Sequence, residues 1–226
     1  MKKIILLLFL FFSILCFFCY YIYIKTEDTT KHITVIGDNI ANNPYFINSK
    51  GYYYNNDFIN KDIRINDLLN IITYNKELAD NKSIHQILKN TNILIISIGM
   101  NDLYYKLNSD TKEIYTYIND MINNYELILN EISKYNYDKV YILGYYNIFK
   151  NKNDIFTYIN YKTNKLVNKY HYVYINMDKL SKNEPKILKK QASIELSNTG
   201  YYQIYKIILE NLKKSWYNIK CIYYYD

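Results

Sequence analysis

The chain has 226 residues, of which 28 are Lys or Arg and 21 are Asp or Glu, so its formal net charge is +7. Hydrophobic residues make up 50%, which excludes a wholly disordered chain, and only 5 Gly and 2 Pro exclude collagen-like and Gly/Pro-rich classes. The basic residues are scattered without a basic stripe, so no nucleic-acid partner is expected. Tyr is unusually abundant at 30 residues, which we attribute to the A/T-rich codons of a low-GC bacterium.

The first segment of the sequence predicts a membrane anchor. Residues 4–24 carry no charge, and a helix of that length spans about 31 Å. Lys2 and Lys3 precede the segment, so the positive-inside rule predicts an uncleaved signal-anchor with the rest of the chain outside the cytoplasm. A cleaved signal peptide and a lipoprotein modified at Cys16 or Cys19 are the alternatives, but the apolar run is long and neither cysteine follows a small residue.

The predicted organisation is a transmembrane signal-anchor at residues 1–25, a polar linker at 26–31 and one domain at 32–226. We therefore expect a single-pass protein of the cell membrane that exposes its C-terminal domain at the cell surface. Outside the anchor Cys221 is the only cysteine. The domain is thus expected to fold without an internal disulfide.

Short apolar runs bounded by Gly or Asn predict strands buried on both faces. In chain order these runs are residues 32–36, 57–60, 92–98, 139–143 and 172–175. Helical periodicity predicts helices at residues 66–73, 83–89, 112–134, 153–170 and 200–214. The alternation predicts a three-layer, doubly wound (flavodoxin-like) α/β domain with a five-stranded parallel sheet of order 2-1-3-4-5. Ligand sites in such folds lie at the carboxyl ends of the strands.

Three short motifs fall at that edge of the predicted sheet. The first is Gly37-Asp38-Asn39, the second is Gly99-Met100-Asn101-Asp102, and the third runs from Ile194 to Gly200-Tyr201. In this order the three motifs resemble those of the SGNH (GDSL-like) hydrolases, a family of bacterial lipases, esterases and carbohydrate acyl-hydrolases. The resemblance covers residues 33 to about 214 and implies an SGNH-hydrolase-like domain.

The resemblance also implies which positions would form the site, and several of them hold other residues. The positions that fit the family are Gly37, Asp38, Gly99, Asn101, Asp102 and Gly200, with Asn101 as the oxyanion donor. Asn39 stands at the position of the Ser nucleophile and Asp62 at that of the oxyanion Gly. Glu195 stands at the position of the His, and Ala192 at that of the Asp.

Ester hydrolysis of this type needs a hydroxyl nucleophile, an imidazole that takes its proton and a carboxylate that orients the imidazole. The residues at the three triad positions supply none of these roles. Of the three histidines, His32 and His171 fall at predicted strand starts and His85 in a helix, away from the site. We therefore expect a catalytically impaired binding or scaffolding module, for cell-wall glycan or an acylated small molecule, with no cofactor and no metal.

Other interpretations stay open at this point. Asp38, Glu195 and Asn101 could form a non-standard site of an active ester or acyl-carbohydrate hydrolase. Asp38 and Glu195 could instead bind a divalent cation, with Asp62 or Asp102 adding oxygen ligands. A relocated nucleophile at Ser97, Ser193 or Ser197 lacks a neighbouring histidine in the sequence. The chain could also be a plain structural anchor protein whose resemblance to the hydrolases is accidental.

Overall fold

The structure is a computed structural model of the chain. It describes residues 11–20, 31–38, 43, 45, 52–55, 63–78, 81–147, 149, 151–177, 180, 186–189 and 194–217. The chain divides into two compact units, residues 1–31 and residues 32–226, and each is considered by itself.

In the first unit, residues 11–20 form a helix whose side chains are all exposed. The remainder of the predicted anchor, residues 1–10 and 21–25, lies outside the described residues. Within the described part of the chain, no helix has the length and apolar character needed to cross a membrane.

The second unit is built on a five-stranded sheet. Its strands are β1 (Lys31–Gly37), β2 (Tyr52–Asn55), β3 (Ile93–Ser97), β4 (Lys139–Leu143) and β5 (Val173–Ile175). Their order in the sheet is β2-β1-β3-β4-β5, as the sequence predicts. The pairs β1–β3, β3–β4 and β4–β5 are parallel, with Val35 opposite Ile95 and Ile95 opposite Tyr141.

One strand lies earlier in the chain than expected. The sequence places the second strand at residues 57–60, which lie outside the described residues, whereas the structure has β2 at Tyr52–Asn55. The apolar runs of the other strands explain their position, because every residue of β3 and all of β4 except Lys139 are buried. A strand buried on both faces needs apolar side chains on both.

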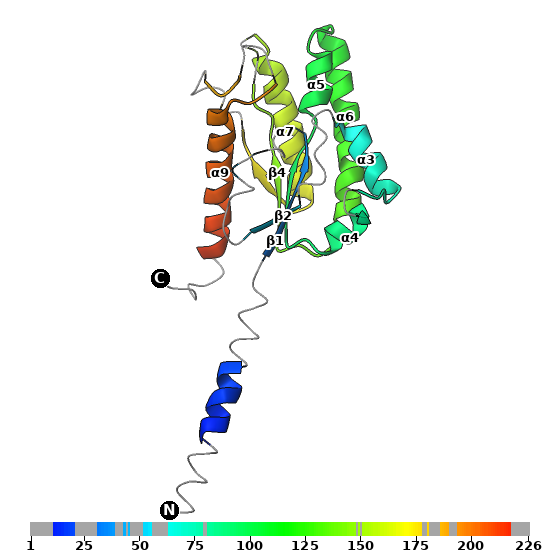
Figure 1. Cartoon of the computed structure of the whole chain (residues 1–226). Helices are drawn as coiled ribbons and strands as arrows, with labels where there is room; N and C mark the ends of the chain where they lie inside the picture. The colour runs from blue at the N-terminus through cyan, green and yellow to red at the C-terminus, as the bar shows by residue number, and fades with distance from the viewer. Residues whose placement is uncertain are drawn as a thin grey trace, which may run out of the picture. The chain divides into compact units, whose positions relative to one another are not determined.

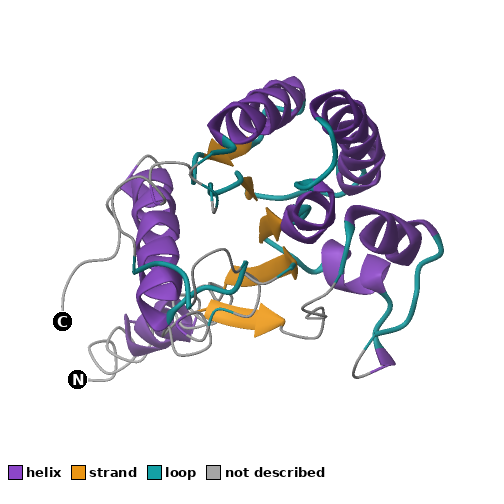
Figure 2. Cartoon of the chain, turned by 90° about the horizontal axis from the view of Figure 1, so that it is seen from above, coloured by secondary structure: helices purple, strands orange, loops and turns teal. Residues whose placement is uncertain are grey.

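Helices cover both faces of this sheet. They are α3 (Ile65–Thr73), α4 (Ile84–Lys89), α5 (Met100–Lys106), α6 (Thr111–Ile132), α7 (Asn153–Lys169) and α9 (Asn198–Tyr217). α9 lies on one side of the sheet, and α3, α6 and α7 lie on the other (Figures 1 and 2). The result is an α/β fold of three layers, helix, sheet and helix.

The longest helix shows how the sequence determines these layers. The periodic apolar side chains of α6, among them Ile114, Ile118 and Tyr125, are buried against the core. α6 begins after Asp110, whose side chain accepts a hydrogen bond of 2.8 Å from the backbone N–H of Glu113. This N-cap satisfies one of the free N–H groups at the helix start.

Candidate functional site

The first motif marks a close approach between β1 and β3. Gly37 has a φ of +136°, and a Cβ at this position would lie 1.6 Å from the carbonyl oxygen of Ser97. The backbone N–H of Asp38 donates to the same carbonyl oxygen at 2.8 Å. Only glycine fits this approach, because a side chain would be both strained and in collision.

The carboxylate of Asp38 points into the protein. It is fully buried, with Oδ1 accepting from Ser97 Oγ at 3.2 Å and Oδ2 accepting from the backbone N–H of Met100 at 3.1 Å. Met100 is the first residue of α5, so Asp38 satisfies one of the free N–H groups at the start of that helix. The side chain therefore joins the end of β1 to the start of α5.

The second motif forms the turn between β3 and α5 and the first turn of that helix. Gly99 has a left-handed backbone conformation, and a Cβ there would lie 2.5 Å from the hydroxyl of Tyr145. Asn101 Nδ2 donates to the carbonyl oxygen of Ile63 at 3.0 Å, and the Asp102 carboxylate accepts from the N–H of Ile65 at 3.1 Å. Both side chains are buried and hold α5 to the start of α3.

The environment of Asp102 shifts the pKa of its carboxyl group. Burial raises the pKa of this carboxyl group above its ordinary value, while the N–H of Ile65 and the Arg64 guanidinium oppose part of the rise. Burial, and then the negative charge of Asp102, raises the pKa of Tyr117. Asp102 is thus a buried structural acid on the second motif.

Buried tyrosines lie beneath the motifs. Tyr145 donates to the carbonyl oxygen of Ile98 at 3.1 Å, and Tyr146 donates to that of Ile194 at 2.7 Å. The hydroxyl of Tyr125 is buried without a hydrogen-bond partner in the described part of the chain. Burial, and then the negative charge of Asp38, raises the pKa values of Tyr125 and Tyr146 well above the ordinary value. These hydroxyls therefore stay protonated at neutral pH.

The third motif lies in a more exposed segment. The Glu195 carboxylate forms an ion pair of 3.0 Å with Lys189, and the two side chains are 53% and 54% exposed. Ser197 Oγ donates to the carbonyl oxygen of Lys186 and accepts from the N–H of Gly200 at 3.1 Å. A Cβ at Gly200 would lie 2.4 Å from the carbonyl oxygen of Ile187. This segment positions the start of α9.

One side chain connects the first and third motifs. Tyr201, in the first turn of α9, is half-buried, and burial raises its pKa, with further contributions from the charges of Glu195 and then Asp38. The structure thus brings these two carboxylates into the neighbourhood of one tyrosine.

The structure does not describe every position of the expected site. Asn39, Asp62 and Ala192, and with them Ser193, lie outside the described residues.

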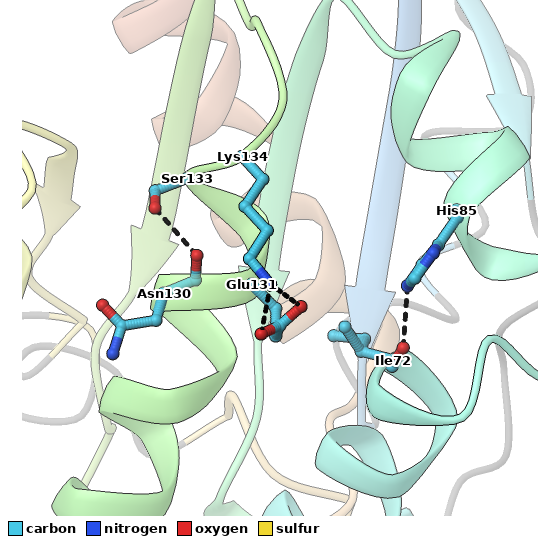
Figure 3. A network of polar contacts seen from close by, with 6 residues as sticks. All are labelled: Ile72, His85, Asn130, Glu131, Ser133 and Lys134. Atoms are coloured by element: carbon cyan, nitrogen blue, oxygen red, sulfur yellow. Dashed lines mark hydrogen bonds and ion pairs between the residues drawn. The ribbon is translucent and has the colours of Figure 1, made fainter.

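All three histidines of the chain are described, and none lies at the carboxyl ends of the strands. His32 is the second residue of β1, and its N–H donates to Asn92 Oδ1 ahead of β3. His171 lies in the turn that leads to β5. His85, in α4, turns its Nε2 to the carbonyl oxygen of Ile72 at 2.8 Å. Figure 3 shows this contact beside the turn that ends α6. The site thus has no imidazole from this chain.

The described residues also offer no evident metal centre. Within them, no group of three or more His, Cys, Asp or Glu side chains is arranged to hold a metal ion. Of the oxygens expected to bind a cation, those of Asp38 and Asp102 accept hydrogen bonds from the backbone, and that of Glu195 pairs with Lys189.

Comparisons with known proteins agree with this architecture. No family model and no curated protein matches the sequence. Among solved structures, the acetyl xylan esterase AlAXEase is 15% identical, with a TM-score of 0.59 over 80% of this chain and 98% of that one. The acetylxylan esterase Axe2 from Geobacillus stearothermophilus is 13% identical, with a TM-score of 0.59 over 80% and 94%.

The chain has an SGNH-hydrolase-like fold. A gut microbial diltiazem-metabolizing enzyme is also similar, at 15% identity and a TM-score of 0.61, over 80% of this chain and 46% of that one. Two further Axe2 structures carry catalytic mutations, one of a serine to alanine and the other of a histidine to alanine. The resemblance expected from the three motifs is therefore confirmed for the fold.

The sequence alone did not single out the buried tyrosines beneath the motifs. Tyr145 and Tyr146 directly follow Gly144 after β4, at the edge where ligand sites form, and this position was the available signal. Because all tyrosines were attributed to codon usage, the position of Tyr145 and Tyr146 was overlooked. The Asp38 contacts to Ser97 and Met100 had no sequence signal, because they join residues about sixty positions apart.

Proposed function

We propose that this chain is a membrane-anchored, extracytoplasmic SGNH-hydrolase-like protein whose domain binds a ligand without hydrolysing it. The observation that carries the proposal is the position of the three histidines, all outside the strand ends where a triad would form. Without an imidazole, no group in the usual place removes a proton from a nucleophile. Asn39, at the position of the nucleophile, has no hydroxyl to activate.

The burial of the remaining motif residues supports the same proposal. Asp38 and Asn101 are 0% and 2% exposed, and both hydrogen-bond to the backbone of neighbouring segments. A group that touches substrate has to reach the surface of the site. These side chains thus maintain the shape of the site. The proposal is that a site of this shape binds an acyl or glycan ligand.

Hydrolysis is tested with the full chain purified in a mild detergent. The substrates are 4-nitrophenyl acetate and an acetylated xylo-oligosaccharide, with a fluorophosphonate probe for an activated serine and Axe2 as the positive control. We expect no turnover above a heat-denatured sample and no label, because loss of a triad costs on the order of 10⁶ in rate. Turnover or specific labelling of the native chain would contradict the proposal.

The membrane part of the proposal rests on the uncharged residues 4–24 and on Lys2 and Lys3 before them. It is tested by fractionating cells that express the full chain and by adding protease to intact cells. We expect the chain in the membrane fraction and its domain cleaved from outside. Release into the medium, or protection of the domain from protease, would overturn this part alone.

The alternative is an ester or acyl-carbohydrate hydrolase with a non-standard site of Asp38, Glu195 and Asn101. It is favoured by the effect of both Glu195 and Asp38 on the titration of Tyr201. This alternative requires turnover with a pH dependence that Glu195→Gln abolishes. Turnover that is absent, or unchanged in this variant, would exclude it.

A further inference from the structure

An exposed group of aromatic rings lies beside the site. Tyr104 and Tyr105 are in α5, which follows the second motif, and Phe149 is in the segment after β4. The centroid of the Tyr104 ring lies 6.4 Å from that of Phe149 and 5.9 Å from that of Tyr105. The guanidinium carbon of Arg64 lies 4.1 Å from the centroid of the Tyr105 ring. We call these four residues the aromatic strip.

The strip remains open to solvent. The side chains of Tyr104 and Tyr105 are 38% and 62% exposed. Arg64 precedes α3 at the point where Asn101 and Asp102 bind the backbone of Ile63 and Ile65, so the strip borders the second motif. Three segments far apart in sequence thus place their rings and one guanidinium along one border of the site.

A shallow groove lined by several charged side chains begins at Lys106, one residue after the strip. Its volume is about 400 Å³, and its lining includes Lys106, Asp110, Glu113, Tyr117 and Asp120. Lys106 follows Tyr105 directly, and its ammonium lies 5.6 Å from the centroid of the Tyr117 ring and 2.9 Å from a Glu113 oxygen. The groove therefore places hydrogen-bonding groups next to the exposed rings.

The formal charges of the strip and groove cancel. The strip and groove carry three cations, Arg64, Lys106 and Lys112, and three carboxylates, Asp110, Glu113 and Asp120. A strongly charged polymer would meet repulsion from one of the two sets, because like charges brought together cost several kcal/mol. The surface instead favours a neutral ligand with an apolar face and many hydroxyls. A pyranose ring has that combination, since its C–H groups can stack on an aromatic ring while its hydroxyls bind carboxylates and ammonium groups.

We infer that the aromatic strip and the adjoining groove bind a neutral oligosaccharide. This inference rests on the proposed function, because it names the ligand class of the binding module and the surface that takes it. The rings of Tyr104 and Tyr105 provide the stacking surface, and Arg64 holds the Tyr105 ring by its cation–π contact. The carboxylates of the groove orient the hydroxyls of the ligand.

The test is calorimetric binding of the full chain in mild detergent to xylohexaose and to chitohexaose. Tyr105→Ala is expected to weaken the binding of at least one of them about tenfold, because it removes the most exposed ring of the strip. Tyr105→Phe keeps the ring and is expected to bind within about twofold of the native chain. Tyr161→Ala is the matched control, because Tyr161 is also 62% exposed but lies in α7, outside the strip. Thermal unfolding of each variant checks that it is folded.

Several outcomes would overturn the inference. Binding that is equal in the native chain and in Tyr105→Ala would exclude the strip and leave the proposed function standing. No binding of either oligosaccharide, or binding of hexametaphosphate in their place, would exclude a neutral glycan as the ligand. Dimers that Tyr105→Ala dissociates would make the strip an interface between two copies of the chain. Hydrolysis of acetylated xylo-oligosaccharide would instead contradict the proposed function, whatever the effect of Tyr105→Ala on binding.

Discussion

The first two motifs differ from the third in how their polar side chains are used. Asp38, Asn101 and Asp102 are buried, and each hydrogen-bonds to the backbone of another segment. Glu195 is half exposed and pairs with Lys189 on the surface. The side chains that match the family's pattern are thus those that hold the edge of the sheet together. At the positions where the resemblance implies only a role in chemistry, the sequence has Asn39, Ala192 and Glu195.

Under the proposed function, this difference gives a physical reason for the retention of a hydrolase fold in a domain that binds without hydrolysing. A buried carboxylate that accepts backbone hydrogen bonds cannot be removed without leaving donors unsatisfied, which costs roughly 1–3 kcal/mol. An exposed imidazole or carboxylate of a triad contributes little to folding and can be replaced at small cost. Structural and catalytic requirements therefore separate within the same three motifs.

The largest expected effect concerns Gly37. Gly37→Ala would place a Cβ 1.6 Å from the carbonyl oxygen of Ser97 at a φ of +136°. We expect it to destabilise the domain by about 3 kcal/mol or more, from collision and backbone strain together. Gly144→Ala is the comparison, because its φ is not positive and its Cβ would meet the side chains of Tyr174 and Asn160 rather than backbone. Urea unfolding of both variants is the measurement, and an equal loss of stability would contradict the argument.

Asn101 is expected to give an intermediate effect. Asn101→Ala leaves the buried carbonyl oxygen of Ile63 without this donor and should lower the free energy of unfolding by roughly 1–3 kcal/mol. The matched control is Asn66→Ala, which removes an exposed hydrogen bond of 2.8 Å to Asn124. That control should change stability by no more than about 0.5 kcal/mol. If both variants unfold at the same urea concentration, the buried contact has no special role.

The comparison between buried and exposed motif residues can be tested at Asp102 through the pH dependence of the free energy of unfolding. Because burial raises its pKa in the folded state, the folded protein keeps this proton more tightly than the unfolded chain does. The free energy of unfolding therefore falls as pH rises from below the ordinary value of 3.8 through the raised pKa. Asp102→Asn removes the charge, and an asparagine oxygen can still accept from Ile65.

The measurement for Asp102 is urea unfolding at several values between about pH 4 and about pH 7. The stability of Asp102→Asn relative to the native chain should increase with pH over this range. The exposed Asp120→Asn serves as the control variant. A difference between Asp102→Asn and the native chain that is constant at every pH would contradict the assigned titration.

Much of the fold could be predicted from the sequence, because burial on both faces demands continuous apolar runs. β1, β3 and β4 lie within one residue of their predicted bounds at each end. The periodic apolar residues of α6 also predicted that helix. β2 was placed too late in the chain, since its sequence YYYN has none of the aliphatic residues that mark the other strands. α5 (Met100–Lys106) was missed because its first residues belong to a Gly-x-Asn-Asp pattern that also indicates a turn.

The candidate site was less predictable. The sequence located Asp38 and Asn101 at strand ends, but it could not tell whether their side chains face solvent or the protein. That orientation depends on Ser97, Met100 and Ile63, which only the folded chain brings near them. For the same reason the aromatic strip, drawn from three separate segments, left no local pattern.

The most direct test of the account compares Asp38→Ala with Glu195→Ala by urea unfolding under the same conditions. Asp38→Ala leaves Ser97 Oγ and the N–H of Met100 without this acceptor, so we predict a loss of roughly 1–3 kcal/mol. Glu195→Ala removes only an exposed ion pair, and we predict a change within about 0.5 kcal/mol. Equal losses, or a larger loss in Glu195→Ala, would contradict the division between structural and catalytic positions.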